Sequence, residues 1–528
     1  MILENGVIRT MDRSLPTARG LAIAGDRVAG GVGTHETAVA GPERIDLGGR
    51  CVVPGFSDSH THFATWSIGQ REVRLEDTRS LEEALTRVRD ALGSTRPGGW
   101  LRGGGWRSGD WSPSIEPTKE MLDEVVGETP AALMARDLHS VWLSSAALAQ
   151  ADGDLQVPGG VVEVDERGEP TGVLREESCW HFRDSYIEIP DDEYVDAMRA
   201  GIKLAHSRGV TAVHDKDGWL GTLRFWQTLH ADGALTLRVW QSLPHEQLGE
   251  LAALGLRSGF GDEYLRVGYL KVFMDGTLGS QTARLLDEAE VGRRRVPGGR
   301  VHWKGIEITS RDELADIVRR GARAGWPVGV HAIGDRANRD ALDAFEATRS
   351  EWQPRGLRQR IEHAQLLDAA DVARFAELGV AASVQFSHAP SDRDLADRLW
   401  AGKTERSYAY RSLLEAGTLL ANGSDAPIEE LDPIAGIRAG VLRTLDDRTA
   451  WHGEQAIDVQ DALEATTVNP AWLARDEHRR GKLLPGYLAD LVVLDRDPVT
   501  CPAEELTELQ VVATMVGGRW IHNPPPWD

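Results

Sequence analysis

P-G-F-S-D-S-H-T-H, at residues 54–62, follows a short apolar run and predicts the end of a strand. The motif places His60 and His62 two residues apart. Alternate residues of a strand face the same side, so both imidazoles can point at one metal ion. Two exposed histidines around a threonine can also arise by chance. The interpretation therefore depends on the rest of the chain.

Runs of this kind recur along the chain and alternate with helical patterns. Short β-branched and apolar runs lie near residues 51–56, 209–214, 235–242, 265–275, 326–332, 358–363, 379–385 and 418–424. From the second run onward they alternate with amphipathic stretches at 192–208, 219–232, 245–256, 310–324, 336–349, 368–378, 407–416 and 459–474. Five stretches end at a glycine that suits a left-handed helix end: Gly209, Gly233, Gly325, Gly379 and Gly417. The spacing from Ser310 to Glu313 fits a capping box.

Eight strands with eight helices predict an α/β fold, a parallel (β/α)8 barrel of the TIM type. The active site of such a barrel lies at the carboxyl ends of its strands. An open, doubly wound parallel sheet is the alternative.

Two parts of the chain do not fit the barrel repeat. The gap between the first and second runs is too long for one βα unit and predicts an inserted subdomain at about 66–190, rich in tryptophan and glycine. Hairpin patterns near both ends predict that the first 50 residues pair with the last 45 or so. We therefore expect a composite β-sandwich from residues 1–50 and 480–528, beside a barrel that spans 51–479.

Composition restricts the partners and the compartment. The 528 residues carry a formal net charge of −23, which argues against a nucleic acid or an anionic membrane surface as partner. The three cysteines, Cys51, Cys179 and Cys501, are far apart and form no C-x-x-C motif, so a reducing cytosol fits. The N-terminus lacks a signal-peptide pattern, and no run approaches the roughly 20 apolar residues of a membrane span. We expect a soluble cytoplasmic protein with a small-molecule substrate, and self-association remains open.

Residues that can bind a metal lie at five of the eight strand ends. They are His60 and His62 at the first, Lys271 at the fourth, His331 at the fifth, His363 at the sixth and Asp425 at the eighth. Each alone has a structural alternative, such as a hydrogen-bonded histidine, a turn carboxylate or a lysine in an ion pair. Together they are hard to attribute to chance, because the strand ends of a barrel converge on one cavity.

These motifs resemble the amidohydrolase superfamily, in the amidohydrolase-3 branch that includes N-substituted formamide deformylase. The resemblance covers nearly the whole chain. It rests on P-G-F-S-D-S-H-T-H, K-V-F-M-D-G-T-L-G-S-Q-T-A, H-A-I-G-D-R-A, R-I-E-H-A-Q, G-S-D-A-P and G-K-L-L-P-G-Y-L-A-D-L-V-V-L-D.

The resemblance implies a site with two divalent ions, expected to be zinc. One ion would be bound by His60, His62 and Asp425, the other by His331 and His363. Lys271 would be carboxylated on its side-chain nitrogen and bridge both ions. A free ammonium beside two cations is strongly disfavoured, whereas a carbamate is an anionic ligand with two oxygens.

The expected activity is hydrolysis of a carbon–nitrogen bond other than a peptide bond, in an amide or N-substituted formamide. Two ions lower the pKa of a shared water, and the resulting hydroxide attacks the carbonyl. Asp425 would accept the hydroxide proton and deliver it to the leaving amine. Asp275 and Asp335 follow the fourth and fifth strands and would orient ligands or loops, or simply cap turns.

The substrate contacts are less defined by the sequence. The candidates are His388 in a loop after the seventh strand, Trp106 and His139 in the insert, and Asp275. Trp142 is a further pocket candidate, and a place in the insert's core is the better expectation for both tryptophans. Phe386 and Ser144 stand where the family often has proline and asparagine.

Other functions have less support. The chain has no G-x-S-x-G, no Walker loop and no G-x-G-x-x-G after a strand. A cyclic-amide or ester hydrolase with the same metal site is the close alternative. A non-catalytic binding protein is a further one, which loss of ligands would favour, yet all six positions are filled.

Overall fold

Eight parallel strands form the centre of the protein. The computed structural model describes residues 1–29, 43–93, 99–151, 153–287 and 304–527. The strands follow the order β19-β18-β17-β16-β15-β14-β13-β6. Their bounds are β6 (Phe56–Thr61), β13 (Val210–Asp215), β14 (Arg238–Pro244), β15 (Leu265–Phe273), β16 (Val328–Ala332), β17 (Arg360–His363), β18 (Ala381–Val384) and β19 (Leu420–Asn422).

The first and last strands of this order, β19 and β6, lie next to each other and close the barrel. The backbone N–H of Asp425 donates to the carbonyl of His60 at 2.7 Å, and that of His62 donates to Ala426 at 2.8 Å. These bonds lie just beyond the end of β19 and at the end of β6. The predicted TIM-type α/β barrel is therefore confirmed.

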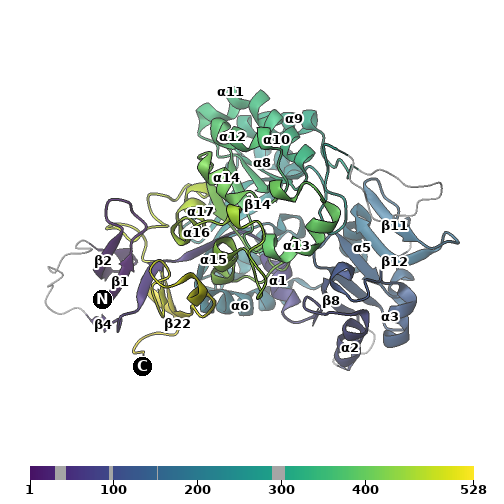
Figure 1. Cartoon of the computed structure of the whole chain (residues 1–528), viewed down its shortest axis with the longest axis horizontal. Helices are drawn as coiled ribbons and strands as arrows, with labels where there is room; N and C mark the ends of the chain where they lie inside the picture. Colours follow the sequence, from purple (N-terminus) through teal and green to yellow (C-terminus); the bar gives the residue numbers. More distant parts are fainter. Residues whose placement is uncertain (30–42, 94–98, 152, 288–303, 528) are drawn as a thin grey trace.

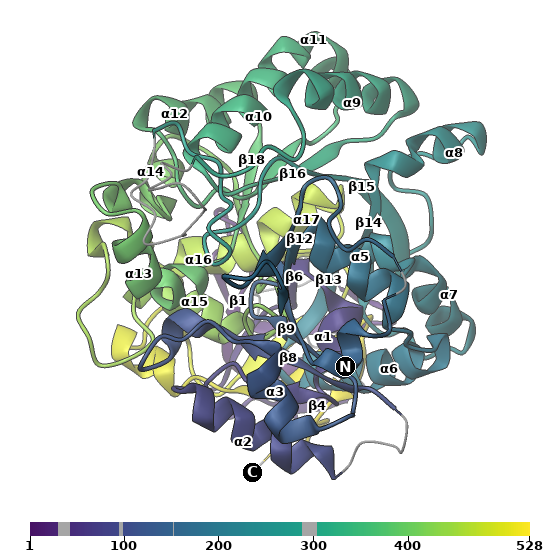
Figure 2. The ribbon, with the colours of Figure 1, turned by 90° about the vertical axis from the view of Figure 1, so that its right-hand side faces the viewer.

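Helices surround the barrel strands. They include α6 (Asp191–Ser207), α7 (Leu223–Ala231), α8 (Leu248–Ala253), α9 (Arg311–Ala324), α10 (Asp335–Ala347), α12 (Ala369–Leu378), α14 (Tyr410–Glu415), α16 (Val459–Thr466) and α17 (Val468–Leu473). Figure 2 shows the helices from α7 round to α14 arranged around the strands. Ser310 and Glu313 form the predicted capping box at the start of α9. Gly325 ends α9 with φ of 85°, as the left-handed cap requires.

The amphipathic stretches predicted for the barrel omit the helices α1 (Phe63–Gly69), α13 (His388–Leu399) and α15 (Pro433–Leu442). They lie in the connections after the first, seventh and eighth strands of the barrel. His388 is consequently the first residue of a helix and does not lie in a loop.

The predicted run at 51–56 is wrong as a barrel strand. Residues Cys51–Pro54 form β5, which belongs to another sheet, and the first barrel strand begins at Phe56. The chain passes between the two sheets at Gly55. A Cβ atom there would lie 2.3 Å from the Thr211 side chain, so only glycine fits at this crossing.

Strands from both ends of the chain share one sheet. It contains β1 (Ile2–Arg9), β2 (Thr17–Ala24), β3 (Arg27–Val28), β4 (Arg44–Asp46), β5 (Cys51–Pro54), β20 (Leu491–Leu494), β21 (Val511–Val516) and β22 (Arg519–His522). The antiparallel pair β5 and β20 joins the N-terminal to the C-terminal strands. The two predicted terminal hairpins correspond to β2–β3 and β21–β22. Residues 30–32 of the first lie outside the described residues.

Residues between β6 and β13 build a third sheet, in the order β11-β12-β10-β9-β8-β7. Its strands are β7 (Val73–Arg74), β8 (Leu101–Trp106), β9 (Ala131–Ala135), β10 (Ser140–Leu143), β11 (Gly160–Val164) and β12 (Pro170–Glu176). The helices α2 (Leu81–Leu92), α3 (Lys119–Val126), α4 (Ser145–Leu148) and α5 (Glu177–Tyr186) belong to the same segment. Figure 1 shows this insert and the terminal sheet on opposite sides of the barrel. Within the described residues, no helix combines the length and apolar character needed to cross a membrane.

Candidate metal centre

The carboxyl ends of the barrel strands surround a cavity of about 290 Å³. All six predicted ligands line it: His60, His62, Lys271, His331, His363 and Asp425. Residues from four strands and the connection after the eighth therefore converge in space, as the barrel topology requires.

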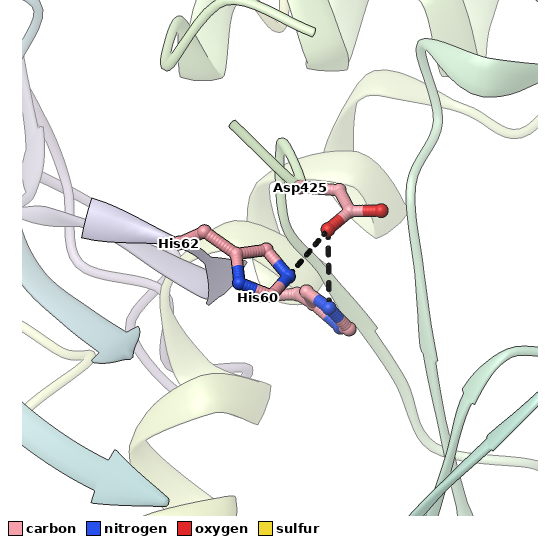
Figure 3. A group of neighbouring side chains, drawn as sticks. All are labelled: His60, His62 and Asp425. Carbon is pink, nitrogen blue, oxygen red and sulfur yellow. Dashed lines mark ion pairs between the residues drawn. The ribbon is translucent and has the colours of Figure 1, made fainter. Parts of the chain in front are cut away.

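Asp425 lies between two histidines of the first strand (Figure 3). Its Oδ1 atom is 3.2 Å from Nε2 of His60 and 3.6 Å from Nε2 of His62. This oxygen is buried and forms no hydrogen bond. A buried carboxylate oxygen without a partner is unfavourable unless a cation satisfies it. Two imidazole nitrogens and one carboxylate oxygen are the donor set that Zn²⁺ prefers, so these residues fit a metal ion.

Two carboxylates orient the histidines of the first strand. Glu362 Oε2 lies 2.8 Å from Nδ1 of His60, and Asp217 Oδ1 lies 2.8 Å from Nδ1 of His62. Carboxylates only accept here, so each Nδ1 carries the proton and each Nε2 keeps its lone pair toward Asp425. Burial also lowers the pKa of His60 to about 4, which keeps the ring neutral at pH 7.

Neutral acceptors orient the other two histidines. Nε2 of His331 lies 3.2 Å from the carbonyl oxygen of Gly276, and Nδ1 of His363 lies 2.9 Å from Oε1 of Gln385. Burial lowers the pKa of both rings well below the ordinary value. The free nitrogens are therefore Nδ1 of His331 and Nε2 of His363, each with a lone pair available to a metal.

Sequence reasoning missed the residues that orient the histidines: Glu362, Asp217 and Gln385. Glu362 precedes His363 on β17, and Asp217 follows β13 by two residues. For Glu362 and Asp217, the only feature of the sequence that indicates a role at the site is a carboxylate close to the end of a predicted strand. Gln385 follows β18 directly and carried no signal of its own.

Two of the predicted ligands occupy strained backbone conformations. His363 has φ of 75° and Asp425 has φ of 59°, in the left-handed region that residues other than glycine rarely adopt. Such strain persists where the surrounding structure fixes it, and it is common at functional sites.

Lys271 is buried beside the histidines. It is 1% exposed, and its Nζ lies 4.8 Å from the centre of the Phe273 ring. Burial lowers the pKa of Lys271 to about 8, against the opposing effect of Glu362 and Asp425. A sizeable fraction of the amine is therefore neutral near pH 8, and the neutral amine is the form that reacts with CO₂ or binds a metal.

Two of the predicted substrate contacts line the cavity. His388 is 4% exposed, and its Nδ1 lies 3.1 Å from Nε2 of Gln365. His139 comes from the insert, and its Nδ1 lies 2.6 Å from Oε2 of the buried Glu176. The insert therefore contributes to the wall of the barrel cavity.

The other candidates have structural positions. Trp106 and Trp142 are buried in the core of the insert, where their indole N–H groups donate to backbone carbonyls, and neither is among the described residues that line the cavity. Asp275 accepts the N–H groups of Ile333 and Gly334, and Asp335 accepts that of Leu286. The two carboxylates thus hold the loops after β15 and β16.

Three aromatic rings form one wall of the cavity. Trp180 on α5 lies 5.8 Å from Phe273 at the end of β15, measured between ring centres. Trp219, in the short helix η2 (Asp217–Leu220), lies 5.2 Å from the same ring. Phe273 in turn is 4.9 Å from the ring of His331. An apolar, aromatic surface therefore begins directly beside the candidate metal ligands.

Comparison with known proteins gives matches over nearly the whole chain. A model of the amidohydrolase family matches residues 43–522. Protein LONG AFTER FAR-RED 3 of Arabidopsis thaliana is 32% identical, over 99% of this chain and 91% of its own length. The N-substituted formamide deformylase of Arthrobacter pascens is 27% identical, over 98% of this chain and 97% of its own. A solved structure of an uncharacterized metal-dependent hydrolase from Pyrococcus horikoshii has a TM-score of 0.76 at 27% identity, and the match covers 95% of this chain and 99% of that one.

Proposed function

This chain belongs to the amidohydrolase family, and we propose that it hydrolyses a carbon–nitrogen bond other than a peptide bond, in an amide or an N-substituted formamide. The observation that carries the proposal is the unpartnered Asp425 oxygen between the Nε2 atoms of His60 and His62. The similarity to the N-substituted formamide deformylase supports this class of bond.

The residues that would hold two zinc ions line the same cavity. His60, His62 and Asp425 would bind one ion, and His331 and His363 the other. Lys271, carboxylated on Nζ, would bridge them, and its lowered pKa favours this modification. When bound, such ions lower the pKa of water and polarise a carbonyl group.

The protein's own residues would handle the proton and the substrate. Asp425 would take up a proton on a carboxylate oxygen and return it to the nitrogen of the leaving amine. Glu362 and Asp217 would keep His60 and His62 in the tautomer that a metal requires.

The shape of the cavity favours a small substrate with a flat apolar substituent on nitrogen. Its volume of about 290 Å³ is at the lower end for ligand sites. Trp180, Trp219 and Phe273 would pack against that substituent. Cys51, Cys179 and Cys501 form no disulfide bond, which is consistent with the proposed location in the reducing cytoplasm.

A hydrolysis assay with matched substrates tests this proposal. The zinc-loaded protein should release 4-nitroaniline from 4-nitroformanilide, and Asp425→Asn should lower kcat by about 10²–10⁴-fold. Asp335→Asn, which removes a buried carboxylate that holds a loop, should retain activity. Turnover of 4-nitrophenyl acetate or a cyclic amide alone would instead assign the site to ester or cyclic-amide hydrolysis.

A further inference from the structure

We propose that His388 donates a hydrogen bond from Nε2 to the carbonyl oxygen of the substrate, an inference that rests on the proposed hydrolysis of an amide. His388 lines the cavity as the first residue of α13. It is 4% exposed, and its Nε2 has no hydrogen-bond partner. An unpartnered polar atom in a buried wall is unfavourable unless a ligand satisfies it.

The hydrogen bond at Nδ1 distinguishes His388 from the four candidate ligands. Each of the four has one ring nitrogen beside an acceptor, which leaves a lone pair on the other. At His388 the side-chain amide of Gln365 donates to Nδ1 at 3.1 Å. Because Nδ1 accepts, the neutral ring carries its proton on Nε2. His388 therefore presents an N–H to the cavity, where the other histidines present lone pairs.

The neighbouring charge favours the same tautomer. Nε2 of His388 lies 4.0 Å from Oδ2 of Asp425. The carboxylate attracts the N–H that the hydrogen bond from Gln365 places on this nitrogen. The distance is too long for a hydrogen bond between the two groups, so the N–H remains available to a substrate oxygen.

This arrangement suits the charge that develops during amide hydrolysis. The carbonyl oxygen becomes negative as the carbon becomes tetrahedral, and a fixed N–H directed at it stabilises that charge. The N-terminal end of α13 adds a positive potential at the same place. Asp425 and His388 would then act on the proton and on the carbonyl oxygen, respectively.

The same geometry permits a competing role. Ligand atoms of His363, His388 and Asp425 lie within 4.8 Å of one another and could hold an ion together. A ligand role requires a lone pair on the nitrogen that faces the ion, whereas the donor role requires a proton on Nε2. The number of metal ions bound per chain in variants of His388 therefore distinguishes the ligand role from the donor role.

Two substitutions of equal length test the proposal. His388→Gln keeps an N–H group near the position of Nε2, and His388→Met has a similar shape without one. With 4-nitroformanilide, His388→Met should lower kcat by about 10²–10³-fold with little change in KM, and His388→Gln should recover most of that loss. Both variants should keep the wild-type number of zinc ions per chain by plasma mass spectrometry. His230→Met alters a surface histidine that pairs with Asp262 and should match the wild type.

Calorimetric titration with formate, the carboxylate product of formamide hydrolysis, gives a measure that does not depend on turnover. Zinc-loaded His388→Met should bind formate about 10-fold more weakly than the wild type, and His388→Gln should bind it nearly as well. Loss of an ion in His388→Met would overturn the donor role in favour of a metal ligand, and equal losses in both variants would also overturn it. If the wild type hydrolyses no formamide, the proposed function fails, and the formate titration still decides the role of His388.

Discussion

Nε2 of His60 lies 3.2 Å from Oδ1 of Asp425, although the two residues come from the opposite ends of the barrel's strand order. His60 is on β6, and Asp425 follows β19. The backbone N–H of Asp425 donates to the carbonyl of His60, and Asp58 accepts the N–H groups of His60 and Ser424. The candidate metal site therefore forms only where the barrel closes, which links metal binding to folding.

Zinc should raise the midpoint of thermal unfolding, because an ion that binds only the closed barrel stabilises the folded state. At a free zinc concentration 100 times Kd, the free energy of unfolding should increase by about 2.7 kcal/mol. Circular dichroism of chelator-treated protein, with and without added zinc, measures it. Asp425→Asn should lose most of this shift, and an equal shift in that variant would place the ion elsewhere.

Asp217→Asn should weaken zinc binding by about 10–100-fold, because His62 loses the carboxylate that fixes its tautomer. Competition with a chromogenic chelator measures the affinity. The matched control is Asp262→Asn, which alters a similar histidine–carboxylate pair on the surface, at 2.6 Å from His230. An equal affinity in the two variants would remove the positioning role of Asp217.

Trp219→Ala should lower kcat/KM for 4-nitroformanilide by about 5–10-fold, because one face of the aromatic wall is lost. N-Methylformamide has no ring to contact that wall, so its kcat/KM should change little. Trp219 is 40% exposed, so its truncation should not unfold the protein. Phe260→Ala, at a 66% exposed position away from the cavity lining, is the control. Equal losses for the two substrates in Trp219→Ala would contradict the proposed contact.

Asp490→Asn should destabilise the protein near pH 7 by about 3 to 5 kcal/mol, because it leaves the buried Arg238 without its carboxylate. Asp490 accepts two bonds from Arg238, at 2.6 and 2.9 Å, and so joins β14 to the terminal sheet. Burial alone would raise the pKa of Asp490, but Arg238 holds it below the ordinary value. This stability is present above the unfolded pKa of about 3.9 and is lost as the pH falls through the lower folded value.

Urea unfolding at pH 7, 5 and 3 measures the difference between wild type and Asp490→Asn, which should shrink only at the lowest pH. Asp191→Asn breaks an exposed pair with Arg224 at similar distances, 2.8 and 2.9 Å. That control substitution should lower the free energy of unfolding by about 0.2–1 kcal/mol. A pH-independent difference for Asp490→Asn would show that the ion pair is not its cause.

The sequence predicted the barrel because strands and helices alternate regularly in it. It also placed six candidate ligands at strand ends, and all six line one cavity. The prediction failed at Cys51–Pro54, because an apolar run carries no sign of which sheet it joins. Strand β20, far along the chain, pairs with this run, and no local pattern marks that pairing.

Contacts between side chains that are far apart in the sequence could not be predicted from the sequence either. Asp217 reaches His62 from just after the neighbouring strand, and Glu362 reaches His60 from a strand that is not its neighbour, so only the folded barrel sets those distances. Trp106 was a candidate for the pocket, but Trp180 and Trp219 occupy its wall, since aromatic character alone does not distinguish core from cavity. The division into domains at 1–50 with 480–528, 51–479 and the insert at 66–190 stays a prediction.

The most direct test of the account is the metal content of the purified chain, measured by plasma mass spectrometry for the wild type and Lys271→Ala after reconstitution with zinc and bicarbonate. We expect about two ions per chain in the wild type and at most one in Lys271→Ala, because the bridging carbamate is lost. A wild type that binds no metal under these conditions would contradict the proposed hydrolase.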